Sequence, residues 1–290
     1  MLQKIFLIFF LLFSFPILVP LVGIPFAVAG PNIQNFRPAA DPFGLTITQG
    51  SQTVLKNEFH LAVLTNYAQK PLEIAGTGNS EHLFSFNLTG AVGILRRYQI
   101  WFDLPFTLSQ EFSGTLAGIQ NTHGLGDVRF GDKMTLLNKR GWGLAMSSFL
   151  VLPTGDNDNL LGDEGVGLGG DLIFDKTGER WLIAVNLGYH GRSQQSTLSN
   201  LRVKHEFKFS AGFSHEIFDD LTAQLEVVGR TAFRDNVSSP IEVLGSLRKD
   251  LNSRWQVMGG GGAGINDGYG APVWRVFLGF GWRPDLKERP

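Results

Sequence analysis

The sequence contains no cysteine among its 290 residues. This absence excludes disulfide bonds, thiolate chemistry and a lipid-modified cysteine after a leader peptide. Basic charge is not in excess either, because 25 Lys and Arg stand against 26 Asp and Glu, for a formal net charge of −1. Removal of Lys4 with the expected leader leaves 24 basic residues and a net charge of −2. We therefore expect no nucleic-acid partner.

Long apolar runs are confined to the N-terminus, at residues 5–24. Lys4 precedes this run, and an Ala-x-Ala pattern at Ala27 and Ala29 follows it. These features are typical of a signal peptide, so we expect residues 1–29 to be cleaved off. An uncleaved membrane helix is the alternative, but three prolines in or beside the run oppose a regular helix. No later run approaches helical-span length, which leaves a closed barrel as the membrane-spanning structure of the mature chain.

Glycine and aromatic residues are abundant instead, with 36 Gly, 24 Phe and 6 Trp, and 43% of the chain is hydrophobic. Such a chain is too apolar to be disordered. Residues 30–56 are rich in Pro, Asn and Gly and are expected to form a periplasmic lead-in. From residue 57 onward, apolar and polar residues alternate with the period of two that is typical of strands.

This alternation predicts about twelve strands that are long enough to cross a bilayer when tilted. The expected strands cover residues 57–68, 82–95, 97–109, 125–137, 141–153, 165–175, 179–191, 202–216, 220–233, 240–250, 253–265 and 272–283. Short turns alternate with longer connections, such as 69–81, 110–123, 154–164 and 192–201. Short turns on the periplasmic side and long loops outside are typical of an up-and-down outer-membrane barrel. We therefore expect an all-β barrel at 57–284, a short tail at 285–290 and both termini in the periplasm.

The two faces of the expected strands differ as a membrane barrel requires. The apolar set is expected to face lipid and the polar set the lumen, whereas a soluble barrel of the lipocalin type would invert this arrangement. Asp132 is an exception on the lipid face, explained either by a bulge at Gly131 or by a place near the interface. Three tryptophans begin expected strands just after short turns, and a fourth closes the last strand at the same end. Together they suggest an aromatic girdle: Trp142, Trp181, Trp255 and Trp282.

Four stretches carry a resemblance to known proteins: GLGDVRFGDKMTLL, GLAMSSFLVLPTGD, NLGYHGR and GAGINDGYGAPVWRVFLGFGW. The chain resembles Gram-negative outer-membrane barrels of the transporter family named after the meta-cleavage pathway of phenol degradation, and the barrel part of OmpA-type proteins. The resemblance covers about residues 40–284. It implies passage of hydrophobic or aromatic compounds. The peptidoglycan-binding domain of OmpA-type proteins has no counterpart in this sequence, so attachment to the cell wall does not carry over.

Charged residues on the expected lumen face are the main candidates for function. They could form a selectivity filter for solutes, or they could pair with one another and fill a narrow interior. These residues are Asp103, Asp127, Arg129, Lys133, Asp171, Lys204, Glu206, Lys208, Glu226, Arg230, Glu242, Arg248 and Arg275. Phe149 and Phe277 are the aromatic residues placed on the same face.

The connection after the fifth expected strand is acidic, with Asp156, Asp158, Asp163 and Glu164. These carboxylates are weak candidates for calcium, because their spacing fails the calcium-loop pattern. A solvated surface loop, bridged by divalent ions to lipopolysaccharide, is favoured. The cluster His190, Ser193, Ser196 and Asn200 has no nucleophile elbow, so no catalytic residue and no cofactor is predicted.

Two classes of function remain open, and lateral delivery of an apolar compound to the membrane is a third possibility. The first is a channel or transporter for small solutes, including hydrophobic or aromatic compounds, through a narrow charge-lined lumen. The second is a non-conducting structural or surface-interaction barrel, favoured if the lumen charges pair tightly and the lead-in occludes the interior. Either class implies the same partners: outer-membrane lipid and lipopolysaccharide, periplasmic chaperones and the barrel-assembly machinery.

Overall fold

The computed structural model describes residues 32–74, 78–113, 123–198, 201–232, 239–266 and 270–285. The expected signal peptide and most of the tail lie outside these residues. In the described part of the chain, no helix is long and apolar enough to cross a membrane. Thirteen strands are present: β1 (Phe59–Ile74), β2 (Gly78–Leu95), β3 (Tyr98–Phe112), β4 (Gly124–Leu125), β5 (Val128–Lys139), β6 (Trp142–Leu152), β7 (Gly167–Thr177), β8 (Trp181–Leu198), β9 (Leu201–Phe218), β10 (Leu221–Thr231), β11 (Ile241–Asp250), β12 (Trp255–Gly264) and β13 (Trp274–Trp282).

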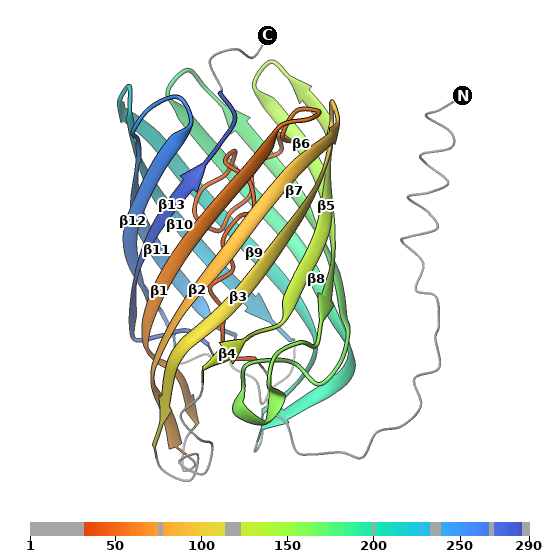
Figure 1. Ribbon diagram of the computed structural model, residues 1–290, viewed down its shortest axis with the longest axis vertical. Coiled ribbons are helices and arrows are strands. Elements are labelled where there is room, and N and C mark those ends of the chain that lie inside the picture. The colour runs from red at the N-terminus through yellow and green to blue at the C-terminus, as the bar shows by residue number, and fades with distance from the viewer. Residues whose placement is uncertain are drawn as a thin grey trace, which may run out of the picture.

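The strands form one closed antiparallel barrel (Figure 1). Each long strand pairs with its neighbours in the sequence, and β1 pairs with β13 to close the wall. The two-residue strand β4 pairs with β3 just before β5 begins, so the wall contains twelve long strands. The prediction of a twelve-stranded up-and-down barrel is confirmed.

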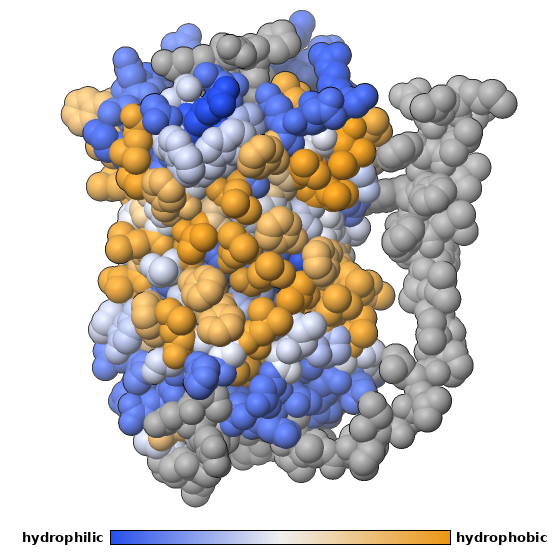
Figure 2. Space-filling view, viewed as in Figure 1, coloured by the Kyte–Doolittle hydropathy of each residue, from blue (hydrophilic) through white to orange (hydrophobic). Residues whose placement is uncertain are grey.

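Alternation along each strand separates a lipid-facing from an inward-facing set of side chains. In β13, Leu278 is 68% exposed on the outside, whereas Arg275 and Phe277 point inward and are 3% and 2% exposed. On the outer surface, a hydrophobic belt lies between two hydrophilic rims (Figure 2). A belt of this kind matches the hydrocarbon layer of a bilayer and its two headgroup regions.

The two ends of the barrel differ, as predicted. Connections of two to four residues join β2 to β3, β5 to β6, β7 to β8, β9 to β10 and β11 to β12, and we call this the short-turn end. The opposite end, the long-loop end, carries the connection 153–166 with a short 3-10 helix at Asn157–Asn159.

Two of the predicted long loops, 69–81 and 192–201, are wrong. Most of their residues extend β1 and β2, and β8 and β9, beyond the predicted limits. Ser193 therefore lies in strand β8 and not in a loop, while Asn200 falls outside the described residues. Backbone pairing continues past the membrane boundary, although the side chains there no longer alternate in polarity.

The interior of the barrel is occupied by residues 32–56, which we call the plug. The plug precedes β1 and passes through the lumen from one end to the other (Figure 1). At the long-loop end, Asn32 N donates a hydrogen bond of 3.3 Å to Asp163, and at the short-turn end, Lys56 pairs with Gly93. The expectation of a periplasmic lead-in is therefore wrong for residues 32–56. The first and last described residues also lie at opposite ends, so the described part of the chain does not place both termini on one side.

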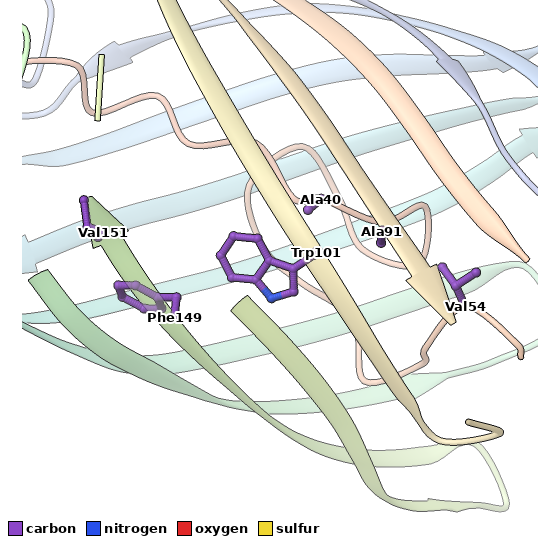
Figure 3. Close-up of a cluster of buried hydrophobic side chains, with 6 residues drawn as sticks. All are labelled: Ala40, Val54, Ala91, Trp101, Phe149 and Val151. Atoms are coloured by element: carbon purple, nitrogen blue, oxygen red, sulfur yellow. The ribbon is translucent and has the colours of Figure 1, made fainter. Parts of the chain in front are cut away.

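The plug completes a core inside the barrel. Ala40 and Val54 of the plug pack with Trp101, Phe149 and other inward side chains of the wall (Figure 3). A second cluster joins Phe36 to Phe277, with ring centroids 5.2 Å apart, and to Ala62, Leu64 and Leu244. Both aromatic residues assigned to the lumen face, Phe149 and Phe277, are thus inward and buried.

Candidate functional site

The plug is anchored to the wall by a buried carboxylate. Glu226 of β10 is 1% exposed and accepts hydrogen bonds from the backbone N–H groups of Thr46, Ile47 and Thr48, at 2.8, 3.0 and 2.7 Å. Three backbone donors replace the water that burial removes from the carboxylate. A tight turn of the plug, in which Leu45 N donates to Thr48 O at 2.8 Å, aims these donors at Glu226.

Lys133 of β5 forms a second anchor. Its ammonium donates hydrogen bonds to Asp41 at 2.5 Å and to the carbonyl of Gly50 at 2.8 Å, and its side chain is fully buried. Gln99 bridges the same region, because its amide nitrogen donates to Asp41 at 2.8 Å and its amide oxygen accepts from Val54 N at 2.7 Å. Lys133 of the wall thus neutralises the charge of Asp41, which lies on the plug.

Further anchors follow the plug through the lumen. Asn186 of β8 both donates to and accepts from the backbone of Gln49, at 3.0 and 2.7 Å. Asp175 of β7 accepts from Ser51 N at 2.5 Å, and Arg248 of β11 donates to Gly44 O at 3.0 Å. The polar contacts of the plug are hydrogen bonds and ion pairs, which can be broken and formed again.

Charges in the long-loop half of the lumen pair mainly with one another. Arg192 contacts Asp163 at 2.7 Å and Glu206 at 2.6 Å. Arg275 makes a two-pronged contact with Glu242, at 2.7 and 2.9 Å. Planar, bidentate pairs of this kind are among the strongest ionic contacts that a buried site can make.

Asp103 has a different environment, because it faces two arginines. Its Oδ2 atom lies 3.6 Å from Arg37 of the plug and 3.5 Å from Arg129 of β5, while Oδ1 accepts a 2.6 Å hydrogen bond from Asn87. The Arg129 guanidinium carbon lies 5.3 Å from the ring centroid of Trp101 and 4.9 Å from that of Phe149. Such distances are typical of cation–π contacts.

A cavity of about 180 Å³ remains between the plug and the wall. Arg37, Ile47 and Gln49 line it from the plug, and Trp101 and Arg129 line it from the wall. Phe149, Asp171, His190, Arg192 and Lys208 complete much of the lining from β6 to β9. Aromatic surface and cationic groups therefore meet in one partly open cavity.

The structure places all thirteen predicted lumen charges in buried or half-buried positions, twelve of them on wall strands. Asp127, the thirteenth, lies between β4 and β5, where it accepts hydrogen bonds from Gly155 N and Asp163 N. Arg230 contacts Glu206 at 3.6 Å, Lys208 contacts Asp171 at 3.0 Å, and Lys204 is half-buried on β9. Some of these residues form ion pairs with other wall residues, and others bind the plug. They therefore do not form a row of unpaired charges along an open pore.

Several functional residues escaped prediction. Arg37 and Asp41 lie in the plug, whose sequence carries no periodic signal, and Arg192 was assigned to a loop. Gln99 and Trp101 share the inward face with Asp103, so strict alternation along β3 would have found them.

The predicted aromatic girdle is at the short-turn end. Trp142 and Trp255 are 60% and 40% exposed, and Trp282 is the register partner of Trp255. Trp181 is half-buried at the start of β8. Phe59 stacks on Trp282 with a centroid distance of 4.1 Å, which adds another ring to this level.

Asp132 lies on the outer face, half-buried beside Ser148. The β5–β6 register is continuous from Val128 to Thr135, so no bulge at Gly131 resets the alternation. Asp132 instead accepts hydrogen bonds from the hydroxyl of Ser148 and, at 3.3 Å, from its backbone N–H.

The acidic connection 153–166 is only partly a solvated loop. Asp156 and Asp158 are exposed, and Asp156 caps the 3-10 helix through Asp158 N at 3.1 Å. Asp163 is buried in its pair with Arg192, and Glu164 is half-buried. Among the described residues, no group of three or more His, Cys, Asp or Glu side chains is arranged to hold a metal ion.

The closed barrel, its hydrophobic belt and its two unlike ends define the class of protein: a Gram-negative outer-membrane β-barrel. The chain belongs to the family described as "Putative MetA-pathway of phenol degradation", which matches residues 45–268. No curated protein sequence matches the chain.

Solved structures similar to this barrel include channels and porins. An outer-membrane channel from Pseudomonas putida F1 is similar with a TM-score of 0.63 and 14% identity, over 80% of this chain and 97% of that one. The NanC porin has a TM-score of 0.54 and 10% identity, over 78% of this chain and 100% of that chain. The KdgM porin has a TM-score of 0.51 and 8% identity, over 77% of this chain and 99% of that chain. At these identities the similarity establishes the fold.

Proposed function

We propose that the protein is an outer-membrane transporter for small molecules, in which the plug must move before a solute can pass. The observation that carries this proposal is the combination of a cavity in the lumen with a plug held by hydrogen bonds and ion pairs. Membership of a family named after phenol degradation favours small hydrophobic or aromatic compounds as cargo.

The proposed orientation follows from the two ends of the barrel. Short turns face the periplasm in outer-membrane barrels, and long loops face outward. The C-terminal end of β13 and the tryptophan girdle then lie on the periplasmic side, and the connection 153–166 lies outside. We further propose contacts with lipopolysaccharide around the belt, and insertion by chaperones and the barrel-assembly machinery. The proposal assigns no catalytic step to the chain.

A non-conducting structural barrel is the second candidate. Two specific observations favour it: the plug occupies the lumen, and most lumen charges are paired. Under this alternative, the plug would be a permanent part of the core and the cavity would have no route to either side.

Planar-bilayer recording of the refolded protein in salt separates the two candidates, with a heat-modifiability gel to prove that the barrel has formed. The transporter predicts discrete current steps each time the plug is displaced. A folded barrel that never conducts, at any applied voltage, would contradict the transporter and support the structural barrel.

A further inference from the structure

The cavity beside the plug has a local excess of positive charge. Arg37 and Arg129 both approach Asp103 Oδ2, at 3.6 and 3.5 Å. These distances exceed the 2.7–2.9 Å that is typical of a charge-assisted hydrogen bond. Among the described residues, no hydrogen-bond partner is found for Arg37 Nη1 or Asp103 Oδ2, although both atoms are buried. Arg37 and Arg129 therefore share the Oδ2 atom of Asp103, and both contacts are longer than a close charge-assisted hydrogen bond.

Two other cations around the cavity, Arg192 and Lys208, have closer counterions. Arg192 has two carboxylates within 2.7 Å, and one of these, Glu206, is also the counterion of Arg230 at 3.6 Å. Lys208 lies 3.0 Å from Asp171. The most distant ion pairs around the cavity are thus those of Arg37 and Arg129 with Asp103 and that of Arg230 with Glu206, and only the first two place two arginines on one carboxylate oxygen.

Aromatic side chains stand directly beside this pair. The Trp101 and Phe149 side chains lie near each other inside the barrel (Figure 3). Their ring centroids are 6.5 Å apart, and both residues line the cavity. Arg129 lies over both rings, at 5.3 and 4.9 Å from their centroids. One side of the cavity is consequently aromatic, while the adjacent side is cationic.

The volume of the cavity limits the size of its occupant. An enclosed apolar cavity of about 150 Å³ holds one benzene molecule. The 180 Å³ cavity therefore has space for a single aromatic ring with one small substituent.

We infer that the cavity binds a monocyclic aromatic carboxylate, with its carboxylate between Arg37 and Arg129 and its ring against Trp101 and Phe149. The ligand would give the second guanidinium the acceptor that Asp103 cannot supply to both. Because Arg37 belongs to the plug and Arg129 to the wall, the ligand would bind at their boundary. This inference rests on the proposed function, since it names the substrate class.

The test is isothermal titration calorimetry of the folded protein in detergent, with benzoate and its neutral analogue benzamide as probes. A carboxylate that bridges two arginines gains contacts that an amide does not, so benzoate is expected to bind about 10-fold or more tightly. Equal affinities, or no binding of benzoate, would overturn the inference. This comparison uses the unaltered protein and does not depend on the folding of a variant.

Variants locate the site. Arg129→Gln and Arg37→Gln are each expected to reduce the preference for benzoate, so that benzoate and benzamide bind with nearly equal affinity. Arg283→Gln should leave it unchanged, because Arg283 pairs with Asp250 at the short-turn end, away from the cavity lining. Preference retained in both cavity variants, with folding verified by heat modifiability, would contradict the assignment.

Failure of this inference and failure of the proposed function give different results. Current steps without a preference for benzoate would overturn the ligand class and leave the transporter in place. Preferential binding of benzoate by a barrel that never conducts would support the site and contradict transport.

Discussion

Glu226 is the residue whose loss should free the plug most directly. Replacement by alanine leaves the N–H groups of Thr46, Ile47 and Thr48 buried without their acceptor. Hydrogen bonds to charged groups are worth about 1.5–3 kcal/mol each and are not additive, so we expect Glu226→Ala to weaken plug docking by roughly 3 kcal/mol. That loss corresponds to an undocked population increased about 100-fold.

Planar-bilayer recording measures this change as an increase in open probability. Asp219→Asn is a suitable control, because Asp219 is 99% exposed and contacts only Arg180 among the described residues. Unchanged channel activity in a folded Glu226→Ala barrel would contradict the role of Glu226 as an anchor.

Asp127 makes the long-loop end sensitive to pH. It lies outside the membrane-crossing strands, where burial and then the charge of Asp163 raise the pKa of its carboxyl from 3.8 to about 6. Because the folded-state pKa is above the unfolded value, the favourable contribution of the protonated form is complete below about pH 3.8 and is lost as the pH rises through about 6.

Asp127→Asn removes this titration and keeps one oxygen acceptor, so one of the two hydrogen bonds, from Gly155 N to Oδ1 or from Asp163 N to Oδ2, is lost at every pH. The melting temperature of the wild type should fall between about pH 4 and about pH 6.5 relative to that of the variant, by an amount equivalent to at most roughly 3 kcal/mol. Asp158→Asn, in an exposed part of the same end, is the control. Parallel pH profiles for the wild type and Asp127→Asn would show that the carboxyl is not perturbed.

Within strand β5, a glycine makes room for the lumen aromatics. A Cβ atom at Gly131 would lie 2.4 Å from the Trp101 ring and 2.4 Å from the carbonyl oxygen of Ser148. A Cβ atom at Gly245 of β11 would meet nothing within 4 Å. The two glycines occupy similar positions in the middle of a strand but differ in available space.

Gly131→Ala should therefore destabilise the barrel by about 1–3 kcal/mol through overpacking. Gly245→Ala should be neutral or slightly stabilising, because glycine costs conformational entropy within a strand. Urea unfolding followed by Trp fluorescence compares the two variants. An equal loss of stability in both would refute the steric explanation.

Much of the wall could be predicted at the scale of single elements. Strands that cross the membrane alternate strictly, as in β13, where Val276 and Leu278 face outward and Arg275 and Phe277 face inward. Alternation fades beyond the membrane, because water allows polar side chains on both faces. The ends of β8 and β9 were for this reason taken for a loop.

The plug could not be predicted in the same way. It has no regular secondary structure across most of its length and therefore leaves no periodic pattern in the sequence. Its anchors are also distant along the chain: Asp41 contacts Lys133, and Thr46 contacts Glu226. Alternation along the strands predicted only that Lys133 and Glu226 point into the barrel. That orientation does not reveal whether the partner of such a side chain is a solute, another wall residue or the plug.

At the scale of the whole molecule, the barrel and the plug differ in how they are held. The wall is a closed ladder of backbone hydrogen bonds, which leaves no exposed edge to open. The plug is held mainly by side chains of that wall, and its first described residues contact the connection 153–166 at the opposite end from Lys56. A molecule with these two parts can release the plug without unfolding the barrel.

The most direct test of this account is a reversible covalent lock between the plug and the wall. The hydroxyl oxygens of Thr46 and Ser246 lie 3.1 Å apart, and the chain has no cysteine of its own to interfere. The double variant Thr46→Cys/Ser246→Cys should therefore form a disulfide when oxidised, whereas each single variant should not.

Current through the lumen of the double variant is then measured in a planar bilayer, first oxidised and then after a reductant is added. The account predicts that current steps are absent in the oxidised protein, return on reduction, and persist in both single variants throughout. Current steps that continue at full size and frequency while the disulfide is intact would contradict the claim that the plug must move.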